Sequence, residues 1–116
     1  MQNRMIHVTR AYAAASARRS VREQEADVFR YANAMLRTAR SEGSQPQARA
    51  LADNRRLWAT LIDLMQDPAN ALPAPLRASI VSVGMTVQRE MDKAPPDFDF
   101  LIAVNEDFAA GLLQAS

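Results

Sequence analysis

The clearest helical pattern in the chain covers residues 44–66, which read SQPQARALADNRRLWATLIDLMQ. Its apolar side chains recur every three or four residues, as on one face of an α-helix; they are Ala50, Leu51, Leu57, Trp58, Leu61, Leu64 and Met65, with Asn54 lying among them. Ser44 and Gln47 have the spacing of a capping box, and Pro46 suits the first turn of a helix. We therefore expect one long helix with a buried face, followed by a turn at Asp67-Pro68-Ala69-Asn70.

A second helical pattern begins upstream of this stretch. Ser20 and Glu23 match a capping box, and the helix that they start is expected to end by Glu42, with Gly43 as its C-terminal stop. The positions that repeat with a helical period are Val21, Glu25, Val28, Phe29, Ala32, Met35, Leu36 and Ala39. A short Ala-rich helix, roughly residues 10–17, is expected before it, and residues 1–9 are expected to be loose.

A third helical pattern follows the turn at residues 67–70. This helix is expected to run from Pro73 to about Lys93, with a face made of Leu76, Ile80, Val83, Gly84, Val87 and Met91. A glycine is unusual inside an apolar face. Gly84 therefore predicts that a neighbouring helix approaches closely at this position.

The last helix is expected after Pro95-Pro96, at about residues 98–114, with Asp97 or Asp99 as its cap. One side carries Phe98, Leu101, Ile102, Asn105, Phe108 and Leu112. Asn54 and Asn105 each lie on an otherwise apolar face. Because buried amides need hydrogen-bond partners, we expect these two side chains to satisfy each other and so to set the register of their helices.

The composition allows one modest domain. The chain has 116 residues, of which 48% are hydrophobic and only three are glycine, so it has enough apolar material for a core and a preference for helix. Short connections between the patterns favour antiparallel neighbours. The sequence therefore predicts an all-α fold, a small single-domain helical bundle of four to five helices over residues 1–116.

The residues that catalysis or metal binding requires are scarce. The chain has no cysteine, and its one histidine, His7, lies in the N-terminal segment that we expect to be loose. Neither a nucleophile with its base nor a zinc site can be assembled from these residues. Asp97 and Asp99 lack further oxygen ligands for a metal ion and lie where helix caps belong. We expect no enzymatic activity, no cofactor and no metal.

The charges are unevenly distributed. The net charge is +1, yet residues 1–22 contain no acid and five arginines: Arg4, Arg10, Arg18, Arg19 and Arg22. The rest of the chain carries −4. The basic segment could bind RNA, because phosphate contacts need clustered arginines. Tyr12 is its only aromatic residue, which favours a solvated or partner-facing tail instead, and pairing with the acidic C-terminal third is a further alternative.

The sequence also bears on location. No stretch approaches the roughly 20 apolar residues that a membrane span needs. The N-terminus lacks the continuous apolar run of a signal peptide. We therefore expect a cytoplasmic protein without a membrane partner.

Six residues are candidates for binding a partner protein: Arg18, Arg19, Arg22, Arg55, Arg56 and Trp58. Arg55 and Arg56 are adjacent and point about 100° apart on a helix, so at least one is available to a partner or to an acid on a neighbouring helix. Trp58 is either a core residue or a partly exposed anchor for a partner. The three N-terminal arginines lie close to the first long helix and are expected to help attract an acidic partner.

Several stretches resemble the FlaF family of flagellar proteins, in order and over most of the chain. The stretches that carry the resemblance are Ala11-Tyr12, residues 21–29 (VREQEADVF), 54–61 (NRRLWATL), 70–80 (NALPAPLRASI) and 102–105 (IAVN), followed by Gly111-Leu112. No single stretch is a chemical motif, and the specificity of the match comes from their number and spacing.

The resemblance implies a regulator of flagellin synthesis that binds newly made flagellin as a chaperone and acts with the translational regulator FlbT. Such a protein needs a groove for an amphipathic helix of flagellin. The alternative function is an RNA-binding regulator that contacts flagellin mRNA through the N-terminal arginines. Nucleic acid is the less favoured partner.

Overall fold

The structure is a computed structural model that describes residues 23–114, and every regular element in this range is a helix. Residues 23–39 form the first described helix, and α2 (Ser44–Gln66), α3 (Ala74–Met91) and α4 (Phe98–Gln114) follow. The expected all-α fold is thus confirmed, with four helices in the described part. The expected helix at residues 10–17, the loose segment 1–9 and the capping box at Ser20 lie outside it.

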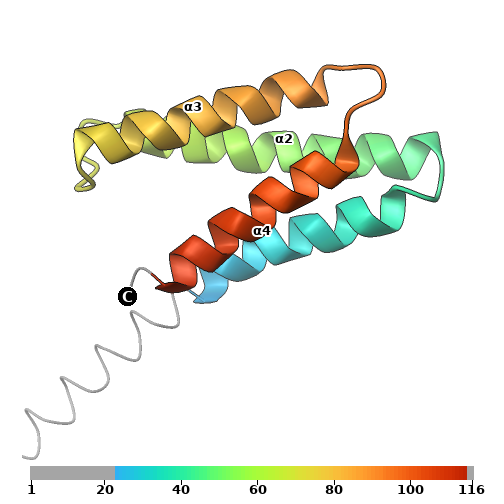
Figure 1. Cartoon of the computed structure of the whole chain (residues 1–116), viewed down its shortest axis with the longest axis horizontal. Helices are drawn as coiled ribbons and strands as arrows, with labels where there is room; N and C mark the ends of the chain where they lie inside the picture. Colours follow the sequence, from blue (N-terminus) through green and yellow to red (C-terminus); the bar gives the residue numbers. More distant parts are fainter. Residues whose placement is uncertain (1–22, 115–116) are drawn as a thin grey trace, which may run out of the picture.

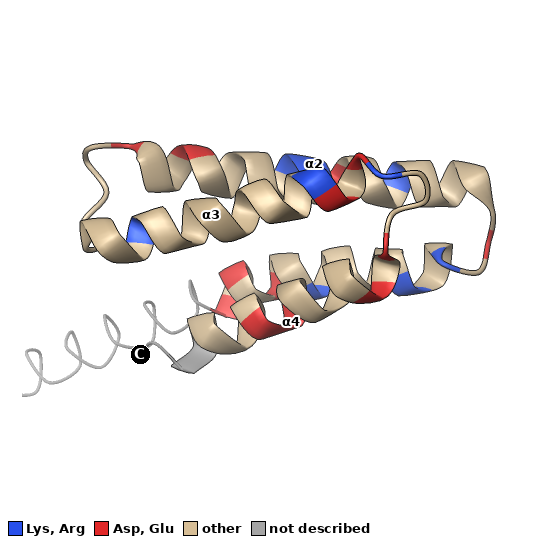
Figure 2. Ribbon diagram, turned by 45° about the horizontal axis from the view of Figure 1, so that its top comes forward, with Lys and Arg blue, Asp and Glu red and all other residues tan. Residues whose placement is uncertain are grey.

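The helices pack as two antiparallel pairs (Figures 1 and 2). One pair is the hairpin of α2 and α3. The other pair joins the first described helix to α4: Asn33 Nδ2 donates to the carbonyl oxygen of Ile102 at 3.0 Å, and Arg40 pairs with Asp99. The two pairs lie closest near the connection between α3 and α4 and diverge toward the end that carries the α2–α3 turn.

The connection between the first two described helices differs from the expectation. The first helix ends at residue 39, and Gly43 does not stop it but caps the N-terminus of α2. Gly43 has φ 110° and ψ −176°, a conformation that is open essentially to glycine alone. The capping box between Ser44 and Gln47 is also wrong, because Ser44 is already helical and the N–H of Gln47 donates to the carbonyl of Gly43 at 3.2 Å.

The cap of α4 is confirmed and assigned to Asp97. Its Oδ1 accepts the N–H of Phe100 at 3.1 Å, the geometry of a side-chain N-cap. Asp99 is instead paired with Arg40 of the first described helix. One of the two aspartates therefore starts the helix, and its neighbour ties that helix to the adjacent one.

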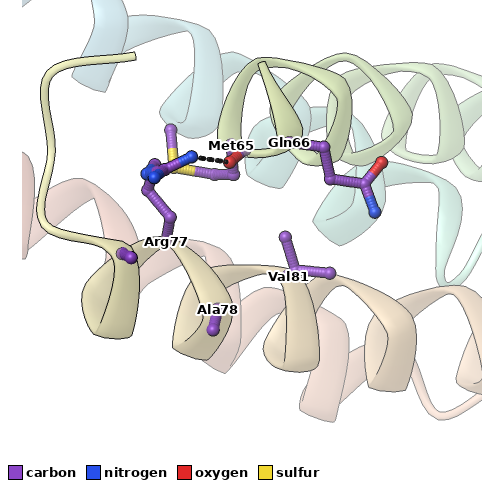
Figure 3. Close-up of a pocket in the computed structure, with 6 residues that line it drawn as sticks. Met65, Gln66, Arg77, Ala78 and Val81 are labelled. Atoms are coloured by element: carbon purple, nitrogen blue, oxygen red, sulfur yellow. Dashed lines mark hydrogen bonds between the residues drawn. The ribbon is translucent and has the colours of Figure 1, made fainter. Parts of the chain in front are cut away.

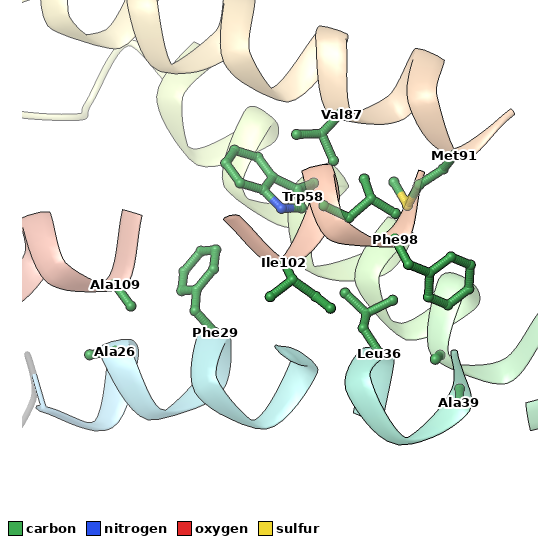
Figure 4. Close-up of a cluster of buried hydrophobic side chains, with 12 residues drawn as sticks. Ala26, Phe29, Leu36, Ala39, Trp58, Val87, Met91, Phe98, Ile102 and Ala109 are labelled. Carbon is green, nitrogen blue, oxygen red and sulfur yellow. The ribbon is translucent and has the colours of Figure 1, made fainter. Parts of the chain in front are cut away.

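The core is built around Trp58, which is completely buried (Figure 4). Its ring packs edge-on against Phe29 and Phe108, with centroid distances of 5.8 and 5.5 Å. Leu36, Val87 and Leu101 are also fully buried. The three aromatic rings come from three helices, so they join the two helix pairs where these lie together. Of the two interpretations of Trp58, the structure supports the core residue.

A polar network lies inside this core. Asn105 Nδ2 donates to Asn54 Oδ1 at 2.7 Å, so the expected mutual satisfaction of the two amides is confirmed. Trp58 Nε1 in turn donates to Asn105 Oδ1 at 2.8 Å. Asn54 Nδ2 lies 3.3 Å from the sulfur of Met91. These contacts join α2 to α4 and α2 to α3, and a shift of one helix along its axis would break them. The network therefore sets the axial register of α2, α3 and α4.

The close approach that Gly84 predicts is confirmed as well. A Cβ atom at this position would lie 2.7 Å from Ile62 Cγ1 and 3.3 Å from Trp58 Cε3. Any side chain larger than hydrogen would therefore collide with α2. The glycine allows the helices of the hairpin to pack at short distance beside Trp58.

Candidate protein-binding surface

Four residues that the helical patterns place on buried faces are in fact exposed. Val28 exposes 51% of its surface, Leu64 53%, Leu76 46% and Val83 43%. The helical period is right on α2 and α3, but the helices there extend past the region where the other pair covers them, since the two pairs diverge toward the turn (Figure 1). On the first described helix, the buried face is instead formed by Ala26, Phe29, Ala32, Asn33, Leu36 and Ala39.

The turn between α2 and α3 is held by its own side chains. Asn70 Nδ2 donates to the carbonyl of Leu64, and Asn70 Oδ1 accepts the N–H of Leu72, both at 2.9 Å. Asp67 Oδ1 accepts the N–H of Ala69 at 2.9 Å. The bonds that the N–H groups of Leu72 and Ala69 donate are Asx-type bonds, which replace the backbone bonds missing from a turn. The turn is therefore ordered by residues that the sequence pattern marked only as turn formers.

Arg77 completes this arrangement from the first turns of α3. Its guanidinium donates to the carbonyl of Leu72 at 3.0 Å and to the carbonyl of Met65 at 3.3 Å, and Figure 3 shows the bond to Met65. It thereby satisfies a free carbonyl at the C-terminus of α2, where a positive charge also complements the helix dipole. Beside it lies an open cavity of about 340 Å³, lined by Met65, Gln66, Ala74, Arg77, Ala78 and Val81. The sequence analysis assigned no role to Arg77.

The result is an apolar surface at the turn end of the hairpin, which we call the hairpin surface: Leu64, Leu72, Leu76 and Val83. Leu72 is 40% exposed. Asn70 connects the backbones of Leu64 and Leu72, and Arg77 fixes the carbonyl of Leu72 next to Leu76. Exposed side chains on an ordered backbone are suited to binding, because the surface loses little conformational entropy when a partner covers it.

The two arginines of α2 have separate surroundings. Arg55 Nη2 donates to Asp92 Oδ1 at 3.1 Å and to the carbonyl of Met91 at 3.4 Å, so this side chain ties α2 to the end of α3. Arg56 is exposed and has no ion-pair partner within residues 23–114. The expectation that one of the pair meets an acid on a neighbouring helix is confirmed for Arg55, and Arg56 points outward.

The remaining candidates for partner binding are Trp58 and the three N-terminal arginines, and none of them is seen as an exposed side chain of the described residues. Trp58 has no exposed surface and can act on a partner only by supporting the fold around it. Arg18, Arg19 and Arg22 lie outside the described residues. The exposed leucines of the hairpin surface were not among the candidates. Leu64 and Leu76 follow the same helical period as the buried residues, so the pattern placed them on buried faces although they lie at the uncovered ends of those faces.

The end of the bundle that carries the hairpin surface is acidic (Figure 2). This end comprises residues 23–31, 60–78 and 104–114 and contains seven carboxylates, namely Glu23, Glu25, Asp27, Asp63, Asp67, Glu106 and Asp107. Only Arg30 and Arg77 oppose them, which gives a formal charge of −5. Arg30 pairs with Asp27 at 3.3 Å, and Arg37, from outside this end, reaches Glu106. The other described residues sum to +1.

Two further observations describe the chemistry of residues 23–114. No helix in this range is long and apolar enough to cross a membrane. No three His, Cys, Asp or Glu side chains of the same range come together in a way that could hold a metal ion.

The fold and this surface define a class: small all-helical bundle proteins with an ordered, exposed apolar surface at one end. Within that class the chain belongs to the FlaF family, because the family model described as "Flagellar protein FlaF" matches residues 8–112. The resemblance seen in the sequence is thus confirmed, and the protein is a flagellar one. No curated protein and no solved structure matches the chain.

Proposed function

We propose that this protein binds flagellin and supports its synthesis and secretion, as a cytoplasmic chaperone and regulator without enzymatic activity that acts with FlbT. Membership of a flagellar family supports the link to flagellin. The observation that carries the binding role is the hairpin surface, where Leu64, Leu72 and Leu76 are each at least 40% exposed on an ordered backbone. Exposed clustered apolar side chains commonly mark sites of protein association.

The shape of this surface favours a helical segment of flagellin. On α3, Leu76, Ile80 and Val83 lie four and three residues apart, on one side of the helix. An amphipathic helix laid along this row would bury its own apolar positions at the same spacing. Burying two exposed leucines on each side contributes several kcal/mol at roughly 25 cal/mol per Å² of apolar surface, before the costs of association are subtracted.

The candidate arginines take different roles in this proposal. Arg56 is exposed on α2 and is available for a polar contact with flagellin. Arg55 is engaged with Asp92 and Met91, so its role is structural. Trp58 maintains the core that holds α2 and α3 together. Trp58→Ala would cost about 3–5 kcal/mol of stability and is therefore unsuitable as a test of binding.

The test is calorimetric titration of flagellin into the Leu64→Ser/Leu76→Ser variant. We expect affinity to fall at least about tenfold, since each anchor removed costs on the order of 1 kcal/mol or more. The matched control is Tyr31→Ser/Met85→Ser, which removes two apolar side chains of similar exposure, 66% and 48%, from outside the hairpin surface. The control should bind within about twofold of the unmodified protein.

Two results would contradict the proposal. One is full-strength binding by the Leu64→Ser/Leu76→Ser variant, which would place the flagellin site elsewhere. The other is capture of flagellin mRNA, with no flagellin, from a motile bacterium that expresses the protein. The latter result would support the RNA-binding alternative.

A further inference from the structure

The hairpin surface is left uncovered by the described residues, and its surroundings indicate what covers it. The face continues the apolar rows that are buried in the middle of the bundle, where Val87 is fully buried, whereas Val83, one turn nearer the α2–α3 turn, is 43% exposed. The same end of the bundle carries −5. An occupant should therefore present apolar side chains together with positive charge.

The chain itself contains a segment with this chemistry. Residues 1–22 have five arginines and no acid, and they are joined to the bundle at residue 23, at the acidic end (Figures 1 and 2). The match to the family model begins at residue 8, so residues 8–22 belong to the family's domain although they precede the described part. The charge of this segment, its attachment at the acidic end and the range of the family match all indicate residues 8–22.

We propose that residues 8–22 cover the hairpin surface in the free protein and that flagellin displaces them. The docking of residues 8–22 does not depend on the proposed function. Their displacement by flagellin does, because it rests on the proposed binding of flagellin. Tyr12 and Ala15, three residues apart in the helix expected at residues 10–17, supply apolar contacts from one face, and Val8 precedes them. Arg18, Arg19 and Arg22 neutralise carboxylates of this end of the bundle.

The segment is long enough to lie along the whole row from Leu76 to Val83. Fifteen residues span roughly 22 Å as a helix and about 50 Å when extended. The distance to be covered along α3, from Leu76 to Val83, is about 10 Å at the helical rise of roughly 1.5 Å per residue. Because the segment is tethered at the same end of the bundle, its effective concentration at the surface is in the millimolar range, so even weak docking is populated.

A second copy of the chain is a poorer occupant. Two hairpin surfaces brought face to face would place two ends of charge −5 against each other. Like charges in an interface oppose association. RNA is disfavoured at this surface for the same reason. The tethered segment is the occupant that supplies the missing charge.

The test uses the full-length protein, which contains no cysteine and therefore accepts a single designed pair. In one variant, Ala15→Cys is combined with Ser79→Cys, an exposed position between Leu76 and Val83. In the matched control, Ala15→Cys is combined with Ser41→Cys, which is exposed in the turn at the opposite end of the bundle. Intramolecular disulfide formation is followed under mild oxidation at low protein concentration.

We expect the Ser79→Cys pair to form its disulfide at least about tenfold faster than the Ser41→Cys pair, because docking raises the local thiol concentration. Adding Leu64→Ser/Leu76→Ser, or Arg18→Glu/Arg19→Glu, should lower the faster rate to that of the control, and high salt should lower it in part. Equal rates for the two pairs, or a rate unaffected by both sets of substitutions, would overturn the proposal.

Flagellin is then added to the reduced Ser79→Cys pair. We expect it to slow disulfide formation, and we expect the oxidised protein to bind flagellin at least about tenfold more weakly than the reduced one. A rate difference between the two pairs that flagellin leaves unchanged would leave the docking in place and overturn the displacement. Failure of flagellin to bind either form would overturn the proposed function and leave the docking result standing.

Discussion

At the residue scale, single side chains in the middle of the bundle join several helices. Trp58 fills the core, and its Nε1 also donates to Asn105, which is itself bonded to Asn54. Asn33, which the sequence analysis did not single out, bonds the carbonyl of Ile102, and its Oδ1 has no partner among the described residues. Such positions tolerate little change, because substituting one member leaves another buried polar group unpaired.

Gly84 gives a prediction at this scale. Gly84→Ala should destabilise the protein by up to about 2 kcal/mol, since overpacking against Ile62 and Trp58 costs roughly 1–3 kcal/mol and alanine returns about 1 kcal/mol of helix propensity. The control is Gly111→Ala in α4, where a Cβ has nothing within 4 Å, and which should stabilise by up to about 1 kcal/mol. Urea unfolding measures both. Two stabilising substitutions would contradict the close approach of α2 and α3.

At the scale of elements, the helices are joined by side chains that act at their ends. Arg77 and Asn70 bind the carbonyls and amides of the α2–α3 turn. The turn between α3 and α4 has a corresponding device: Glu90 Oε2 accepts the N–H of Asp97 at 2.9 Å, and its Oε1 pairs with Lys93 at 3.1 Å. Glu90 thus connects the end of α3 to the residue that caps α4.

These contacts make stability depend on pH. The N–H of Asp97, and after it the side chain of Lys93, hold the pKa of Glu90 below its usual value. Because the folded state has the lower pKa, the carboxylate stabilises the fold above the pKa of the unfolded chain. This contribution disappears as the pH falls through the folded pKa. We expect Glu90→Gln to be less stable than the unmodified protein at pH 7 and the difference to shrink in acid. Thermal unfolding of both proteins from pH 7 down to a pH below the folded pKa of Glu90 measures the difference in stability. A difference that does not vary with pH would refute the stabilising role given to the Glu90 carboxylate.

At the scale of the whole molecule, burial decreases along the hairpin toward its turn while negative charge accumulates there. The divergence of the two helix pairs exposes Leu64 and Leu76, and it leaves the middle of the bundle closed around Trp58. One end of the molecule therefore exposes apolar side chains beside negative charge, and the remainder holds the helices in place.

This division predicts where substitutions are tolerated. Leu64→Ala and Leu76→Ala, at positions 53% and 46% exposed, should each cost about 1 kcal/mol or less. Leu101→Ala, at a fully buried position, should cost about 2–5 kcal/mol. Urea unfolding of the three variants provides the comparison. Equal losses for all three would mean that the end of the hairpin belongs to the core.

The sequence by itself determined the local features of this protein: four helices in the described part, a cap at Asp97 or Asp99, the turn at residues 67–70 and the close contact at Gly84. The family could also be inferred from the order and spacing of its stretches. These features depend on nearby residues or on helical period, which a single chain displays directly. Even the pairing of Asn54 with Asn105 could be expected, because two buried amides on apolar faces have few other partners.

Only the tertiary structure decided which parts of each apolar face are covered. The row through Val87, Val83 and Leu76 is uniform in sequence, yet one end is buried and the other exposed. The difference arises because the two helix pairs diverge, and the angle between packed helices depends on contacts among residues far apart in the chain. The same packing assigned Trp58 to the core, engaged Arg55 with Asp92 and brought seven carboxylates to one end. The candidate binding surface is therefore a property of the packed helices, and helical period alone could not locate it.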